Sequence, residues 1–198
     1  MDEFDGAYDA SIITKVEGNC LQIDNLYSEW NIDTWAKTLG ADMLRLWTVS
    51  MVAFTGYLSI IYMLRRATAK LHNLTDPNAT DDLLWRMPLV QSVSYKILDV
   101  AHVVLRTDAR FDVLCILFGC FNIHLPYSYV AHRLIEATDI EADEECVTLL
   151  DDIAQIVQTA TGASQEAAPL GIAFQKLNAQ VQTRASALRE QDFQNRST

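Results

Sequence analysis

The feature that most constrains the fold is a stretch of 19 residues without a charged side chain, Leu46–Leu64 (LWTVSMVAFTGYLSIIYML). At about 1.5 Å per residue, a helix of this length reaches roughly across the 30 Å hydrocarbon core of a bilayer. In a protein that does not enter a membrane, such a helix has to be packed on several sides. The stretch therefore predicts either a central core helix or a single membrane span.

Residues at the ends of the stretch and inside it bear on this choice. Trp47 and Tyr62 lie near its ends and Arg65–Arg66 follow it, as in the aromatic belt and basic flank of a membrane span. Five small or polar residues dilute the apolar run, namely Thr48, Ser50, Thr55, Gly56 and Ser59. The sequence holds no second stretch of this length. We interpret Leu46–Leu64 as a buried central helix and keep a span over 46–64 as the alternative.

Three N-x-S/T sequences, at Asn73, Asn78 and Asn195, fit the acceptor pattern for N-glycosylation. A membrane span would place its basic flank, Arg65–Lys70, in the cytoplasm. Asn73 and Asn78 would then lie on the side of the membrane where no glycan is added. Because the two signals contradict each other, we interpret the three sequences as chance matches.

The charge balance argues against direct contact with nucleic acid. The chain has 15 Lys and Arg against 26 Asp and Glu, a net charge of −11, whereas binding to phosphates needs an excess of basic residues. Seven glycines and four prolines are too few for the turns of a many-stranded β fold. The acidic start, Met1–Asp5, is unlike the basic start of a signal peptide. These observations predict an acidic helical protein inside the cell.

Apolar residues recur every three or four positions over most of the chain, which predicts helices. A first helix carries Phe4, Tyr8, Ile12 and Val16 and is expected to end at Gly18–Asn19, since glycine commonly terminates helices. Asp42 is expected to open the long apolar helix, and a turn-rich linker near 75–82 (TDPNATDD) to separate two helical halves. Pro88 is expected in the first turn of a helix, and Pro126 to end or kink a later one. The last helix is expected to start at 167–169.

That last helix carries a core-facing stripe of Leu170, Phe174, Leu177, Val181, Ala185 and Leu188, at the spacing of an amphipathic helix. Residues 189–198 (REQDFQNRST) are polar and are expected to form a flexible tail. The sequence therefore predicts an all-α fold. Residues 1–188 form a single compact domain of about seven or eight helices around the hydrophobic central helix.

The acidic run Asp139–Glu145 begins like a calcium-binding loop, with acids at alternate positions. An EF-hand needs a glycine at loop position six and a glutamate at position twelve, but the chain has Glu144 and Leu150 there. The run precedes a predicted helix, and carboxylates are favourable at a helix N-terminus. We interpret the run as helix capping.

The cysteines and histidines do not match a recognised zinc pattern. Cys120 and His124 are four residues apart, with Cys115 and His132 nearby, but zinc needs three or four ligands in tetrahedral geometry. With Cys20 and Cys146, these cysteines are expected to be reduced and buried, because no CxxC pair occurs. The sequence also lacks GxSxG, GxGxxG, GxxxxGK[ST] and HExxH. We predict no catalytic, cofactor-binding or metal-binding residue, and no ligand-binding residue is identified.

The order of helices over 85–187 resembles a known family. VQSVSYKILDVAHVVLRTD leads to FDVLCILFGCFNIHL, and after a Pro-Tyr break come YVAHRLIEA, CVTLLDDIAQIVQTA and PLGIAFQKLNAQV. This order resembles the C-terminal part of the regulatory (middle homology) domain of fungal zinc-cluster transcription factors, and YLSIIYMLRRA is similar to an apolar helix of that domain. The six-cysteine zinc cluster of the family is absent from this chain.

The resemblance implies a nuclear, non-catalytic regulatory domain that restrains or releases transcriptional activation. Its partner would be another protein or a small apolar effector, and homodimers are a further option. The first alternative is a single-span membrane protein with span 46–64 and a cytoplasmic helical domain. An enzyme of unrecognised type is the second alternative, since catalytic residues can assemble from distant parts of a sequence.

Overall fold

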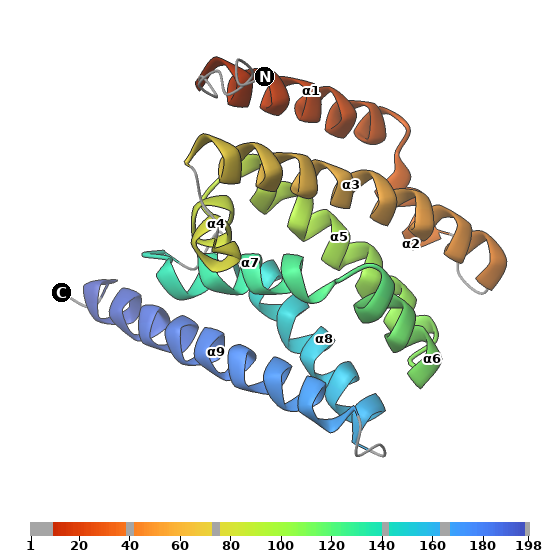
Figure 1. The fold of residues 1–198 in the computed structure, drawn as a ribbon. Helices are drawn as coiled ribbons and strands as arrows, with labels where there is room; N and C mark the ends of the chain where they lie inside the picture. Colours follow the sequence, from red (N-terminus) through yellow and green to blue (C-terminus); the bar gives the residue numbers. More distant parts are fainter. Residues whose placement is uncertain (1–9, 39–41, 73–75, 140–142, 163–166, 197–198) are drawn as a thin grey trace.

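The structure is a computed structural model that describes residues 10–38, 42–72, 76–139, 143–162 and 167–196. Every regular element in these ranges is helical (Figure 1), which confirms the predicted all-α domain. The elements are α1 (Ala10–Glu29), α2 (Ile32–Thr38), α3 (Met43–Leu71), α4 (Pro77–Leu84), α5 (Pro88–Thr107), α6 (Phe111–Leu114), the π-helix η1 (Cys115–Cys120), α7 (His124–Glu136), α8 (Glu144–Thr161) and α9 (Ala168–Arg196).

Helix α3 contains the long uncharged stretch and packs against four other helices. Asp42 caps its N-terminus, and the Asp42 carboxylate accepts a hydrogen bond from the Arg45 backbone N–H at 3.2 Å. Helices α1, α2, α4 and α5 all contact α3, and its fully buried side chains include Phe54, Tyr57 and Ile61. The central position expected of this helix is therefore found, although one of its faces is exposed.

The structure also bears on whether α3 could be a membrane span. Within the described ranges, α3 is the one single helix long and apolar enough to cross a membrane, and 44% of its most apolar window is buried by the rest of the protein. A second candidate arises only if Phe111–Cys120 and His124–Glu136 are taken as one span bent by 76°. Helix α3 is thus partly buried in a packed domain.

The remaining helices continue the packing away from α3 (Figure 1). Helix α5 contacts α3 on one side and α7 and α8 on the other, and α9 covers α7 and α8. Aromatic rings join these layers, since Phe174 of α9 lies with its ring centroid 4.2 Å from Tyr127 and 5.1 Å from Phe118. The apolar stripe predicted for the last helix faces this core: Phe174, Val181, Ala185 and Leu188 are buried, and Leu170 and Leu177 pack against it.

The expected helix end at Gly18–Asn19 is wrong. Helix α1 runs without interruption to Glu29, and the chain turns at Asn31, whose φ is 53°. A Cβ added at Gly18 would meet nothing within 4 Å. Glycine terminates a helix by adopting a left-handed conformation, and inside a helix it only lowers stability by about 0.5–1 kcal/mol. Phe4 and Tyr8 lie outside the described residues.

The linker expected near 75–82 is also corrected. Residues 77–84 form α4, in which Pro77 occupies the first turn and the Asp76 carboxylate accepts a hydrogen bond from the Asn78 backbone N–H at 2.9 Å. Asp81 attaches this helix to the core, because its carboxylate pairs with Arg65 at 3.0 Å and accepts from the Tyr129 hydroxyl at 2.7 Å. The turn residues Asp76-Pro77 start a helix here.

Two further boundaries differ from the sequence prediction. Pro126 lies in the first turn of α7, where its missing N–H costs nothing, and the preceding helix ends at the π-helix before Asn122, whose φ is 49°. The tail expected at 189–198 is helical as far as Arg196. Arg189 forms two hydrogen bonds, of 2.8 and 2.7 Å, with the carboxylate of Glu144 in α8, and these hold the last turns of α9 to the domain.

Candidate functional site

The best candidate for a functional site is a cleft of about 720 Å³ on the side of α5 that faces α7. We call it the central cleft. Helices α2, α5, α7 and α8 and the turn between α4 and α5 supply its walls. Its lining residues are Lys37, Arg86, Pro88, Gln91, Ser92, Tyr95, Lys96, Asp99, Val130, Arg133, Asp143 and Cys146. A shallower hollow shares Arg86, Gln91, Arg133 and Asp143 with it, so the two form one continuous groove.

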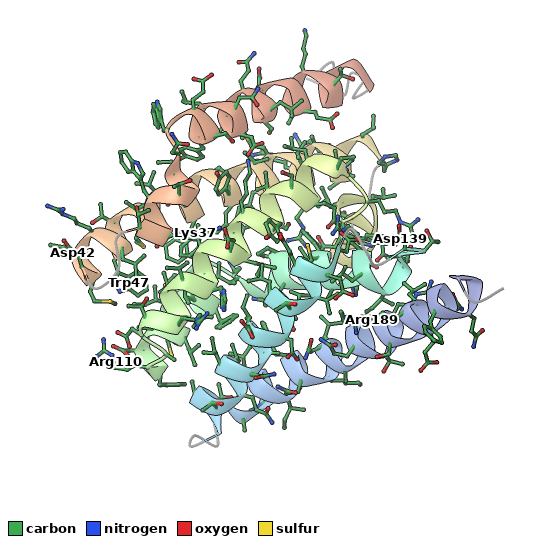
Figure 2. The ribbon with its side chains drawn as sticks, turned by 180° about the vertical axis from the view of Figure 1, so that it is seen from behind. Lys37, Asp42, Trp47, Arg110, Asp139 and Arg189 are labelled. Carbon is green, nitrogen blue, oxygen red and sulfur yellow. The ribbon has the colours of Figure 1, made fainter. Side chains whose placement is uncertain are left out.

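Two lysines line the end of the cleft near α1 and α2. Lys37 of α2 (labelled in Figure 2) pairs with Asp99 of α5 at 2.7 Å. Lys96 pairs with Asp24 of α1 at 2.6 Å and also contacts the Ser28 hydroxyl at 3.2 Å. Lys96 and Asp24 are both largely buried, whereas about half of the Lys37 side chain is exposed. Lys37 is therefore the cation at this end that a bound molecule reaches most directly.

Two arginines line the opposite end. Arg86 lies over the Trp85 ring, 4.6 Å from its centroid, and pairs with Glu136 at 3.3 Å. Arg133 of α7 pairs with Asp143, which lies at the N-cap position of α8, and the Arg133 guanidinium lies 3.5 Å from the Cys146 sulfur. Guanidinium groups bind carboxylates and phosphates in a fixed planar geometry. This end of the cleft can hold an anionic group.

Unpartnered polar atoms mark the middle of the cleft. Gln91 is 9% exposed, and its amide nitrogen donates hydrogen bonds to the backbone carbonyls of Trp85 and Tyr129. Its Oε1 atom is buried and has no hydrogen-bond partner among the residues that the structure describes, and the same holds for Nε of Arg133. Buried polar atoms in native proteins are nearly always paired. Both atoms are closed off from the cleft by neighbouring atoms, so a bound molecule would reach them only if the Gln91 or Arg133 side chain turned.

The two most reactive groups in the cleft are held in their neutral forms. Burial raises the pKa of the Cys146 thiol, and the nearby carboxylates of Asp143 and Glu145 add to this effect, while Arg133 opposes it. Burial also raises the pKa of the Tyr95 hydroxyl, and the Asp99 carboxylate acts in the same direction. Since the thiolate is the nucleophilic form of cysteine, burial makes the Cys146 thiol less nucleophilic than an exposed one.

The residues tested as metal ligands from the sequence are not brought together. Asn122, with its positive φ, breaks the helix between Cys120 and His124, so their spacing of four residues does not place them on one helical face. Across the parts of the chain that the structure describes, no group of three or more His, Cys, Asp or Glu side chains could hold a metal ion.

The acidic run of 139–145 falls partly outside the described residues, which omit 140–142. Asp143 precedes α8 and pairs with Arg133. Glu144 and Glu145 lie in the first turn of α8, where carboxylates are favoured by the helix dipole. The acids therefore lie at the helix start as expected, but the Asp143 side chain makes no capping hydrogen bond with the described residues.

The cleft residues Gln91, Tyr95 and Arg133 were not singled out from the sequence. A signal for them exists in α5, where Gln91, Tyr95 and Asp99 follow one another at intervals of four, beside Ser92 and Lys96. Residues at this spacing lie on one face of a helix. This polar face adjoins the apolar stripe of α5. It indicates that α5 has a polar surface in addition to the surface that packs in the core.

Comparison with known proteins adds no relative of this chain. No family model matches the sequence, no curated protein matches it, and no solved structure matches the fold.

Proposed function

We propose that this chain is a non-catalytic regulatory domain that binds a small effector in the central cleft. The observation that carries the proposal is a 720 Å³ cleft whose lining combines the guanidinium groups of Arg86 and Arg133 with apolar surface. Pockets for small molecules are usually concave, partly apolar, and supplied with a few fixed polar groups.

The chemistry of the cleft narrows the effector to an amphipathic molecule with one acidic group. Arg133 and Arg86 offer guanidinium groups to a carboxylate or a similar anion. Pro88, Val130 and the ring of Tyr95 offer apolar surface between the charged ends. The effector of this proposal therefore has a charged end, which a purely apolar molecule lacks.

An aromatic sulfonate, 1-anilinonaphthalene-8-sulfonate, has this combination of anion and apolar body and serves as the probe. Fluorescence titration of the full chain measures its affinity. Arg133→Met is expected to weaken binding at least about tenfold, because a charge-assisted hydrogen bond contributes about 1.5–3 kcal/mol. Circular dichroism and urea unfolding of the variant check that it remains folded.

The matched control for this titration is Trp30→Ala with Trp35→Ala, which removes two exposed rings that are 53% and 54% accessible. These rings lie outside the cleft lining and offer the probe another apolar surface. The proposal requires near-normal binding in this control. Normal binding by Arg133→Met, or loss of binding in the tryptophan variant, would show that the probe binds elsewhere.

The regulatory role in transcription comes from the helix order over 85–187 that resembles the domain of fungal zinc-cluster factors. A reporter assay tests it, with the full chain inserted between a heterologous DNA-binding domain and an acidic activation domain. We expect the inserted chain to lower reporter output, and Gln91→Met to change the level of repression. Full output with a stably expressed insert would contradict a regulatory role.

A membrane-anchored protein is the second candidate, and the exposed face of α3 is the observation that favours it. Leu44 is 79% exposed, and Met51, Val52 and Met63 are each about 40% exposed. This candidate requires α3 to leave its contacts with α1, α2, α4 and α5. Purification of the full chain without detergent as a monodisperse species would rule it out.

A further inference from the structure

The π-helix η1 places two cysteines at its ends, Cys115 and Cys120. Its backbone is held by bonds between residues five apart, such as the 3.2 Å bond from the Phe121 N–H to the Ile116 carbonyl. Such π-turns are rare inside helices and are frequent at functional sites. The turn also lies against the core, because the ring of Phe121 is 5.1 Å from that of Phe54.

The π-turn changes which residues are neighbours on the helix surface. In an α-helix, with about 3.6 residues per turn, residues five apart point to different sides. In a π-helix, residues five apart are joined by the backbone bond and lie one turn apart. Cys115 and Cys120 therefore follow one another on the same side of η1.

That side faces the solvent. The expectation that the cysteines are buried is wrong for Cys115 and Cys120, which are both exposed, whereas Leu117 and Phe118 between them are buried. Gly119 separates the pair without adding a side chain, and a Cβ at this position would meet nothing within 4 Å. The space around the two thiols is open to a small oxidant.

We propose that Cys115 and Cys120 form a reversible intrahelical disulfide when the protein meets a peroxide. The backbone bonds of a π-helix join residues five apart and so keep them about one turn from each other, and disulfides join Cα atoms roughly 4.4–6.8 Å apart. One thiol, as its thiolate, attacks the peroxide oxygen, which gives a sulfenic acid and one water as the O–O bond breaks. The second thiol displaces the sulfenic hydroxyl, which leaves as a second water when the S–S bond forms.

The other two cysteines serve as internal controls. Cys20 is fully buried, and burial raises the pKa of its thiol. Cys146 is half-buried in the central cleft, where burial also raises its thiol pKa. Oxidation follows thiolate character and exposure. The pair on η1 is therefore expected to react first.

Residues next to the two cysteines contact other helices of the domain. Asn122, two residues after Cys120, donates a hydrogen bond to the Tyr62 hydroxyl of α3 at 3.0 Å. Leu117 and Phe118, inside the closed loop, belong to the core that also holds Phe174 of α9. The bond would fix the turn that connects α6 to α7.

The test treats the reduced full chain with one equivalent of hydrogen peroxide, then blocks remaining thiols with N-ethylmaleimide under denaturing conditions. We expect the intact mass to show that two hydrogens have been lost in forming the disulfide. It should also show that two maleimide groups have been added, one on Cys20 and one on Cys146. Chymotryptic cleavage after Phe118 would leave two fragments joined by the disulfide. Dithiothreitol should restore four blocked thiols.

Two sets of variants sharpen the result. Cys115→Ser and Cys120→Ser should each abolish the intramolecular bond, while Cys20→Ala with Cys146→Ala should retain it. Peptide mapping of the unaltered chain decides the question even where a variant fails to fold. A disulfide involving Cys20 or Cys146, a disulfide between chains, or oxidation that stops at sulfinic acid would overturn the proposal.

Discussion

Helices α3 and α9 have the same length, 29 residues each, but they differ in how many neighbouring helices cover them. Helix α3 contacts α1, α2, α4 and α5, whereas α9 contacts mainly α8 and α7 (Figure 1). An uncharged sequence suits the first position because several faces are covered. A narrow apolar stripe on a polar background suits the second, because one face is covered and the others meet water.

The comparison also explains why the charges lie where they do. Between Leu46 and Leu64, α3 has no charged residue, but its flanks carry Arg45 with Asp42 and Arg65 with Asp81. Helix α9 instead holds its polar end by Arg189 with Glu144 (Figure 2). The number of neighbours around a helix therefore sets how much apolar sequence it needs, and we expect substitutions to differ accordingly.

The largest expected effect comes from Phe54→Ala in α3. Phe54 is fully buried against Phe121, and truncation of a buried phenylalanine costs about 3–5 kcal/mol. Urea unfolding measures the change in the free energy of unfolding. Ile172→Ala in α9 is the control, since this side chain is 66% exposed and its loss should change stability by about 0.5 kcal/mol or less. Equal losses at both sites would contradict the contrast between the helices.

The second prediction concerns the close approach of α1 to α3. A Cβ at Gly56 would lie 1.9 Å from Cε2 of Tyr27, so Gly56→Ala forces the ring away from α3 and should cost about 1–3 kcal/mol. Gly18→Ala is the matched control in α1, because its Cβ would meet nothing, and it should stabilise the protein by about 0.5–1 kcal/mol. A stabilising Gly56→Ala would show that α1 does not pack this tightly.

These sites show how far the sequence could predict the molecule. The uncharged run of Leu46–Leu64 and the stripe of the last helix predicted a core helix and an amphipathic one, because periodicity reports local burial. The continuation of α1 through Gly18 could not be predicted, since glycine is compatible with both a helix and its end. Which partner an acidic side chain binds depends on the tertiary structure. Asp81, for example, accepts a hydrogen bond from Tyr129 and pairs with Arg65, and both of these residues are distant in the sequence.

Less of the candidate site than of the fold could be predicted from the sequence. Its polar wall on α5 is visible as Gln91, Tyr95 and Asp99 at intervals of four. The partners of these residues come from α2, α7 and α8, and their approach depends on helix packing rather than on sequence spacing. The π-turn at Cys115–Cys120 has no composition signature either, since the same residues would suit an α-helix.

The third prediction concerns His102 of α5, in the layer between α3 and α8. Burial lowers the pKa of His102, and Arg106 acts in the same direction, while Asp152, 3.2 Å away, and Asp99 oppose this. The unfolded chain therefore binds a proton more readily than the folded one, and stability should fall as the pH drops below about 6.5. His102→Gln should flatten this dependence in urea unfolding at several pH values. An unchanged slope would show that other groups cause it.

The smallest expected effect is that of Arg189→Ala at the end of α9. Arg189 and Glu144 are each about 45% exposed, and exposed ion pairs contribute about 0.2–1 kcal/mol because water and salt screen them. The hydrogen bond from Arg189 lowers the pKa of the Glu144 carboxyl. The contribution of the pair is therefore present above the carboxyl pKa of the unfolded chain and is lost as the pH falls through the folded one.

Glu190→Ala, one residue further along α9 and exposed, is the control for Arg189→Ala. Urea unfolding at low and high salt separates the two, because only the loss at Arg189 should shrink as salt screens the pair. Amide hydrogen exchange over 189–196 gives a local readout, and these amides should exchange faster in Arg189→Ala. If exchange there is already fast in the unaltered chain, the last turns of α9 are held neither by this pair nor by the domain. The contrast between the two 29-residue helices would then begin at Leu188, where the apolar stripe ends.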